Sequence, residues 1–553
     1  MYTIHDGEIV FKEKYGSSQH SRLYIKPPEQ ENIVAVSDDK KEDVTSIFTK
    51  VFLPQGYPDS VSRDYISYQI WDTAQAFCST ITGTLATQEV LRGVGVGDTT
   101  ATPLAATITW VLKDGCGHIG RILFAYSNGI YLDAYSKKWR LYADTLNDAA
   151  MCIELALPVF KDFTTLVLCL TTVMKAIVGV AGGATRAAMT QHHAIRGNMA
   201  DVAAKDSAQE TAVNLVASIF ALLIITTFGN SLTIFVLMII LHIVFNYSAV
   251  RAVCLRTLNE PRFLTLINVY LKEEVISSPC QVNKNEPLMF YQIVSHFLDL
   301  QLCGFNIKIG KSLKQALDGN PTKASYMRSI QDVYDLREYI LLPDIVNRNM
   351  YVILRSTATT NDILCAYFHA VLLSTVICAI NNVPLNVYQH PDYTSRPFAK
   401  ICATLQEADW TQEDANEPRT RFKFNPSVEL MVYMDKIAHK EWLRIKNALT
   451  RTGWDLSKHL LIVDEWRLCT AKVVTRTISL TNTQETVGGS KLITFEDSAT
   501  DDTIIRRDTF TIEPDKFAAT QRISTNLSAT ESGSNASTDL RIDNQDKSHF
   551  KRE

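Results

Sequence analysis

Forty consecutive residues, Thr211 to Val250, contain no Asp, Glu, Lys or Arg. As a helix this run would extend about 60 Å, roughly twice the hydrocarbon core of a bilayer. Gly229-Asn230-Ser231 near its middle is a turn signal. The pattern therefore predicts a transmembrane helical hairpin, with one span over 211–228 and a second over 232–250. The alternative, a buried hairpin in a large soluble protein, rarely runs this long without a charge.

The flanks of this run predict its orientation. Positive charges lie on both sides of it, and the tip between the spans has none. They are Arg186, Arg196, Lys205, Arg251, Arg256, Arg262 and Lys272. The positive-inside rule places both ends of the hairpin, and the chain that follows, on the cytosolic, matrix or stromal side.

The polarity pattern changes twice more along the chain. Residues 1–45 form a polar leader, and residues 46–275 are apolar and rich in glycine. Residues 276–474 have the pattern of a soluble α/β or α+β domain. Its predicted elements are strands at 350–355, 428–434 and 460–463 and helices at 361–380 and 436–452. Although 363–380 is apolar enough to span a membrane, the preceding strand and its short length favour a core helix.

The last part of the chain, 475–553, is rich in Ser, Thr and Asp and is predicted to be disordered. Its two glycosylation sequons begin at Asn526 and Asn535, and a cytosolic tail would leave both unused. The resulting fold class is mainly α: a multi-pass α-helical membrane domain, a C-terminal soluble α/β (or α+β) domain and a disordered tail.

Composition agrees with a membrane protein that has large soluble parts. The chain has 553 residues and a net charge of −4, so no overall basic charge points to nucleic acid. Its eleven cysteines include no CxxC pair. The count and spacing favour reduced thiols over a disulfide framework or a zinc site.

Charged residues inside the apolar segments are the candidates for a substrate path. They are Asp98, Lys113, Asp114, Arg121, Asp148, Glu154, Lys175 and Arg186. Asp144, Asp148 and Glu154 lie on one stripe of a helix at 100° per residue. Such a stripe could bind a cation or proton, or pair structurally with nearby Arg and Lys side chains.

Three glycine clusters lie in the same region. Gly115 to Gly120 match GxGxxG, but no βαβ unit follows, so close helix packing is favoured over nucleotide binding. Gly179 and Gly183 are predicted to pack two helices closely. Residues 93–97 alternate Gly and Val and are interpreted as a hinge or helix break.

The hairpin itself predicts a polar layer in the membrane. Folding back near residue 230 brings Asn214 to the depth of Asn246 and Ser218 to the depth of His242. Each residue is four positions from another on its own helix, so all four are expected on one seam. Unpaired polar groups are costly in hydrocarbon, so we expect hydrogen bonds across these two pairs.

Catalytic signatures are missing from the sequence. HExxH, GxSxG and the Walker motif do not occur, and His192-His193, His118 and His242 lack metal-ligand spacing. We therefore expect no catalytic residues, no metal and no cofactor.

Several segments together resemble one family. They are FLPQGYPDSVSRDYISYQIWDTAQAF (52–77), TGTLATQEVLRGVGVGDTTATPLAATITWVLKDGCGHIGRILFA (82–125), KKWRLYADTLNDAAMCIELALP (137–158), IVGVAGGATRAAMTQHHA (177–194) and NMADVAAKDSAQETAVNL (198–215). The chain resembles the root UV-B sensitive (RUS) family over about 48–275. The resemblance implies a multi-pass membrane protein without an established biochemical activity. It also implies a link to vitamin B6 homeostasis and association with other family members.

Three functions follow as hypotheses. The first is an integral membrane scaffold or regulator that acts through protein partners such as other RUS family members. The alternative is a transporter or carrier of a small, charged or neutral, metabolite, and the third is a membrane-bound enzyme. The absence of catalytic motifs favours scaffolding, and the charges within apolar segments favour carriage.

Overall fold

The computed structural model describes residues 8–14, 21–27, 31–37, 44–94, 102–288, 303–318, 324–381 and 426–469, together with the short segments 486–487, 490–494 and 509–511. Predictions for Asp98, for most of the hinge at 93–97, and for Asn526 and Asn535 concern residues outside these ranges. The chain forms two compact units, Met1–Thr470 and Ala471–Glu553.

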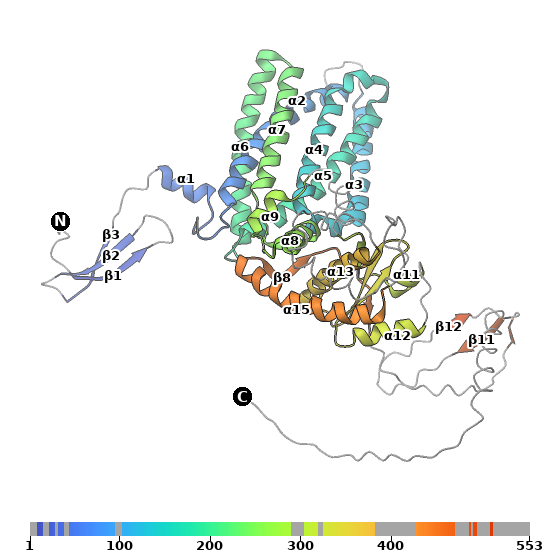
Figure 1. The fold of residues 1–553 in the computed structure, drawn as a ribbon. Coiled ribbons are helices and arrows are strands. Elements are labelled where there is room, and N and C mark those ends of the chain that lie inside the picture. Colours follow the sequence, from blue (N-terminus) through green and yellow to red (C-terminus); the bar gives the residue numbers. More distant parts are fainter. Residues whose placement is uncertain are drawn as a thin grey trace, which may run out of the picture. The chain divides into compact units, whose positions relative to one another are not determined.

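The structure is mainly helical, and its largest feature is a bundle of long helices (Figure 1). The bundle comprises α2 (Tyr65–Gly93), α3 (Pro103–Ala134), α4 (Ser136–Leu155), α5 (Thr164–His193), α6 (Met199–Phe228) and α7 (Leu232–Ala252). The 3-10 helix η1 (Leu157–Phe163) connects α4 to α5. The predicted turn at 229–231 joins α6 to α7, and Gly229 adopts a φ of +66° there, which favours glycine.

Apolar side chains cover the outside of this bundle. α5, α6 and α7 are long and apolar enough to cross a membrane, and only 11% to 28% of the residues in their most apolar stretches are buried. The exposed faces carry large aliphatic residues such as Leu170, Ile219 and Ile240. An exposed apolar surface of this extent is typical of an interaction or membrane surface.

The fourth membrane-length helix, α13 (Thr360–Ile380), is placed differently. Every residue of its apolar stretch is buried. It packs on a mixed sheet of β5 (Asn306–Ile309), β7 (Asn349–Arg355) and β6 (Tyr339–Asp344), with β9 (Arg467–Leu468) beside β7. The core-helix interpretation of this segment therefore agrees with the structure.

The first unit contains further elements between residues 44 and 460 besides these two parts. They are α1 (Val44–Phe52), β4 (Thr257–Asn259), α8 (Glu260–Glu273), α9 (Pro279–Asn285), α11 (Leu313–Asp318), α12 (Ala324–Val333), α15 (Val428–Thr452) and β8 (Asp455–Leu460). β4 and β8 pair in parallel, and α13 packs against α15.

Two predicted strands are wrong. Residues 428–434 begin α15, because Ser427 accepts a hydrogen bond from the Leu430 amide and caps the helix. The buried positions of α15 then follow a helical period that seven alternating residues could not reveal. The strand expected at 460–463 ends at Leu460, and Val463 makes only an isolated bridge to Ile309.

Short sheets occur near both ends of the chain. The interval interpreted as a polar leader contains an antiparallel sheet of β1 (Glu8–Lys14), β2 (Ser21–Lys26) and β3 (Val34–Ser37). In the second unit, β10 (Thr486–Val487), β11 (Ser490–Thr494) and β12 (Thr509–Thr511) pair in the same way. Most of the predicted disordered tail lies outside the described residues.

Close helix packing was predicted for two glycine clusters, and the structure supports it for the GxGxxG segment and not for Gly179 and Gly183. A Cβ on Gly183 would meet nothing within 4 Å, and one on Gly179 would meet only the Arg121 guanidinium at 3.8 Å. Gly117 and Gly120, from the GxGxxG segment, lie at the α3–α5 contact instead. A Cβ on either would come within 2.8 or 2.9 Å of Thr172 or Val173. The glycine-rich segment therefore permits close helix packing.

We predict opposite effects for two neighbouring alanine substitutions on α3. Gly117→Ala should lower stability by about 1–3 kcal/mol, because its methyl group meets the rotamer-restricted Thr172. Gly115→Ala meets nothing within 4 Å and should raise stability by up to about 1 kcal/mol through helix propensity. Thermal unfolding of the purified full chain in detergent measures both. Equal shifts of the same sign would contradict the packing role.

Candidate functional site

A row of charged side chains on α4 faces the interior of the bundle. Arg140, Asp144 and Asp148 are spaced by four residues, so they lie on one face of the helix. α2 and α7 pack against this face. Polar groups from three helices therefore meet inside a bundle whose outer surface is apolar.

These groups form a continuous chain of ion pairs and hydrogen bonds, here called the polar column: Asp144, Arg140, Asp72, Gln75, His242 and Asp148. Arg140 lies 3.3 Å from Asp144 and donates to Asp72 at 2.9 Å. Gln75 donates to Asp72 at 3.2 Å. The ring nitrogens of His242 lie 2.8 Å from Gln75 Oε1 and 2.8 Å from Asp148 Oδ2.

Donor and acceptor rules fix the protonation pattern around His242. An ionised carboxylate only accepts hydrogen bonds, so the Gln75 amide nitrogen faces Asp72 and its oxygen faces His242. Nε2 of His242 must then carry a hydrogen. The contact between Nδ1 and Asp148 consequently holds one further proton, on the imidazole or on the carboxylate. One hydrogen is thus shared between the His242 imidazole and the Asp148 carboxylate.

Two more ion pairs lie along the bundle. Lys175 Nζ on α5 is 2.5 Å from Glu154 Oε2 on α4, and the Lys175 side chain remains 39% exposed. Arg186 contacts Asp206 at 2.7 Å and Glu210 at 2.5 Å, which joins α5 to α6. Four of the residues nominated for a substrate path are therefore paired in the bundle: Asp148, Glu154, Lys175 and Arg186.

The other nominated residues do not join them. Lys113, Asp114 and Arg121 lie on α3, where Asp114 and Arg121 are exposed and Lys113 lies 3.4 Å from Asp114. Asp98 is outside the described residues. The nominated set is therefore divided between the bundle interior and the surface of α3.

The pairs predicted within the α6–α7 hairpin are wrong. Asn214 accepts a hydrogen bond from Thr80 of α2, and Ser218 donates to its own helix at the Asn214 carbonyl. His242 turns to α4 and α2, and Asn246 is buried with no partner for its Oδ1. The cause is α2, which packs closely against both α6 and α7 and replaces the direct contact between them.

A cavity of about 770 Å³ lies between α1, α2, α6 and α7. Its lining is mostly apolar, from Phe52 of α1 to Phe245 of α7, and its polar side chains are Gln69, Thr73 and Gln209. The size is within the range of ligand pockets, but the lining does not suit a charged solute.

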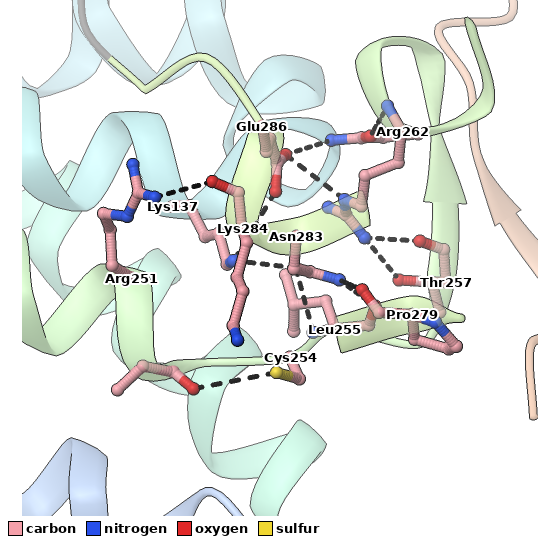
Figure 2. Close-up of polar contacts among 12 residues, drawn as sticks. Lys137, Arg251, Cys254, Leu255, Thr257, Arg262, Pro279, Asn283, Lys284 and Glu286 are labelled. Atoms are coloured by element: carbon pink, nitrogen blue, oxygen red, sulfur yellow. Dashed lines mark hydrogen bonds and ion pairs between the residues drawn. The ribbon is translucent and has the colours of Figure 1, made fainter. Parts of the chain in front are cut away.

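A second buried charge cluster joins α4 to the chain that follows α7 (Figure 2). Lys137 lies 2.7 Å from Asn283 Oδ1 and 3.5 Å from Glu286 Oε2. Arg262 lies 3.2 Å from Glu286 Oε1. The side chains of these three charged residues are at most 5% exposed.

Burial by itself would raise the pKa of Glu286. The charges of Arg262 and Lys137 and hydrogen bonds from Asn259 and Arg262 outweigh it, so its pKa lies below the usual 4.5. Breaking such a cluster on one side leaves a buried charge uncompensated. No local sequence pattern indicated this cluster, because Lys137 and Glu286 are far apart along the chain.

Comparison with known proteins gives two family-model matches that together cover residues 38–470. Residues 38–274 match the model described as "Vitamin B6 photo-protection and homoeostasis domain". Residues 275–470 match "Root UVB sensitive protein, C-terminal". The cluster of Lys137, Arg262 and Glu286 lies across the junction of the two matches.

Individual relatives agree with these two family-model matches. "RUS family member 1" of Dictyostelium discoideum is 45% identical over 261 residues, which cover 46% of this chain and about half of that protein, 49%. "Protein root UVB sensitive 3" of Arabidopsis thaliana is 33% identical over 386 residues, 68% of this chain and 85% of that protein. "Protein root UVB sensitive 2, chloroplastic" of the same plant is 28% identical over 397 residues, 70% of this chain and 88% of that protein. No solved structure matches the chain.

We predict that Glu286→Gln changes how the free energy of unfolding falls at acidic pH. The stability from the ionised carboxylate is fully present above the unfolded pKa, near 4.5, and is lost as the pH falls through the lower folded pKa. The variant should lose about 3–5 kcal/mol at neutral pH and show a flatter decline below pH 4.5. Glu273→Gln, at an exposed position of α8, is the control. The measurement is the thermal unfolding midpoint as a function of pH. If the midpoint falls equally steeply below pH 4.5 in the wild type and in Glu286→Gln, the result would count against the cluster.

Proposed function

Because this chain belongs to the root UVB sensitive (RUS) family, we propose that it is a multi-pass membrane carrier. In this proposal the α2–α7 bundle lies in the bilayer, and the polar column moves protons together with a small ionisable solute. The observation that carries the proposal is the position of His242 between Asp148 and Gln75.

The membrane part of the proposal rests on the outer surface of the bundle. α5, α6 and α7 have the length and composition of membrane spans and expose most of their apolar stretches. Basic residues at both ends of the α6–α7 hairpin favour a cytosolic, matrix or stromal location for those ends. The C-terminal domain and the tail would share that side.

The depth of His242 supports a role beyond packing. It lies ten residues from each end of α7 (Leu232–Ala252), or about 15 Å at 1.5 Å per residue. That distance corresponds to the middle of a hydrocarbon core about 30 Å thick. Ionisable groups at this depth are costly and commonly mark proton relays or solute paths.

The solute class follows from the family description and the charges present. The matched model is described by vitamin B6 photo-protection and homoeostasis, and we extend that description to this chain as part of the proposal. Lys175, still 39% exposed beside Glu154, offers a positive group to an anionic solute. Vitamin B6 compounds are therefore the first solutes to test.

We predict that the protein stays in the membrane pellet after alkaline carbonate extraction, because the exposed faces of α5, α6 and α7 need hydrocarbon contact. Fractionation of membranes that contain the full chain, followed by immunoblotting, measures this. Recovery in the supernatant would contradict the membrane proposal. A peripheral membrane protein, released by the same treatment, is the control.

We predict that His242→Leu and Asp148→Asn each lower proton-linked solute uptake at least about tenfold, because the first removes the imidazole and the second the carboxylate that share the proton. Uptake is measured in proteoliposomes with an internal pH-sensitive dye and an outward or inward pH gradient. Asn246→Leu is the matched control, since Asn246 is also buried on α7 but lies outside the polar column. It should retain uptake within about twofold.

Unchanged uptake in His242→Leu, or no uptake by the wild type, would overturn carriage. A second candidate function, a membrane scaffold for protein partners, would then take its place. The buried cluster of Lys137, Arg262 and Glu286 favours it, because that cluster fixes the chain after α7 to the bundle. Co-purification of the full chain with other RUS proteins, lost in Lys137→Met, tests this candidate.

A further inference from the structure

Asp64, His192 and His193 form a compact cluster at the end of α5. Asp64 immediately precedes α2, and the two histidines are the last residues of α5. One donor atom from each residue lies within 4.8 Å of the others. Their side chains are 12%, 11% and 2% exposed, respectively. The cluster is thus nearly buried and is separate from the polar column.

The distances in the cluster are close to those of a metal site. His192 Nε2 lies 2.9 Å from Asp64 Oδ2, and His193 Nδ1 lies 3.9 Å from Asp64 Oδ1. Donor atoms bound tetrahedrally to one zinc ion are about 3.3 Å apart, given bonds of about 2.0–2.1 Å. The two observed separations lie on either side of that value.

Asp64 does not act as a helix cap. Although it occupies the N-cap position of α2, where an Asp side chain usually accepts a hydrogen bond from its own helix, it makes no such bond. Its carboxylate instead faces His192 and accepts a 2.6 Å hydrogen bond from the Cys254 amide. Burial alone would raise the pKa of Asp64, but the His192 contact and bonds from Ser62 and Cys254 hold it well below its usual range.

Backbone contacts hold the cluster in place. The Ser62 amide donates to the His193 carbonyl at 3.1 Å, and Val61 forms a β-bridge with Ala194. Together with the Cys254 amide, these contacts fix three distant segments of the chain around the same point. Fixed ligands are what a metal site requires of its protein.

We propose that Asp64, His192 and His193 bind one divalent transition-metal ion, with zinc as the best match. Two imidazole nitrogens and one carboxylate oxygen are ligands that zinc accepts. Metal at Nδ1 of His193 would replace the 2.6 Å hydrogen bond between this nitrogen and the Ser62 hydroxyl. Three protein ligands leave a position for water or for the Ser62 hydroxyl.

The simpler interpretation is a purely structural hydrogen bond between Asp64 and His192, here called a staple. A staple and a metal site differ in one measurable respect, which is binding of the metal alone. The sequence did not indicate the site because adjacent histidines lack ligand spacing, and the carboxylate is 128 residues away.

The test uses the purified full chain in detergent, stripped with a chelator and then titrated with Zn²⁺ or Co²⁺. We expect one ion per chain by elemental analysis, and a Co²⁺ spectrum of nitrogen and oxygen ligation. His192→Ala and Asp64→Asn should each weaken Zn²⁺ binding roughly 100-fold or more. His118→Ala, at an exposed histidine of α3, is the control and should bind normally.

Asp64→Asn keeps an acceptor for the Cys254 amide, so it separates ligand loss from misfolding if His192→Ala fails to fold. Zn²⁺ should also raise the thermal unfolding midpoint of the wild type and not that of Asp64→Asn. Binding below one ion per chain, thiolate-to-cobalt charge-transfer bands, or equal affinity in Asp64→Asn would each overturn the proposal.

Discussion

Charge neutralisation along α4 is the constraint on which the bundle depends. Arg140, Asp144, Asp148 and Glu154 would be costly against hydrocarbon, and each has an oppositely charged or ionisable partner nearby. The partners come from α2, α5 and α7, so these helices must surround α4. Their remaining faces are then free to be apolar, which is what the exposed surfaces of α5, α6 and α7 are.

The same kind of interaction links the bundle to the rest of the first unit. Lys137 lies about one turn closer to the N-terminus of α4 than Arg140. Its side chain contacts Glu286 and Asn283, which follow α7 in the chain. A buried ion cluster is weak evidence for added stability, because desolvation opposes the Coulomb attraction. The geometric consequence of the cluster is clearer. Loss of one charge leaves the other charged groups unpaired, so Lys137, Arg262 and Glu286 are expected to come together as a set or not at all.

Periodicity predicted the elements that are long and strongly patterned. The hairpin, its turn at 229–231, the strand at 350–355 and the core helix at 361–380 all agree with the structure. The pattern failed at 428–434, where seven alternating residues fit a strand as well as the first turns of a helix. The close packing predicted at Gly179 and Gly183 is also absent. Small residues indicate where a helix can pack closely, but they do not indicate which of its faces another helix covers.

The sequence by itself determined the family, because the matching segments follow one another in order between residues 52 and 215, and it located the apolar hairpin from a charge-free run of forty residues. Only the tertiary structure decided the partners of each polar residue. His242 meets Asp148 and Gln75 because α2 and α4 lie beside α7, and Asp64 meets His192 across 128 residues. Local hydrophobicity is set residue by residue, whereas hydrogen bonds between helices depend on which helices are neighbours and how each is rotated.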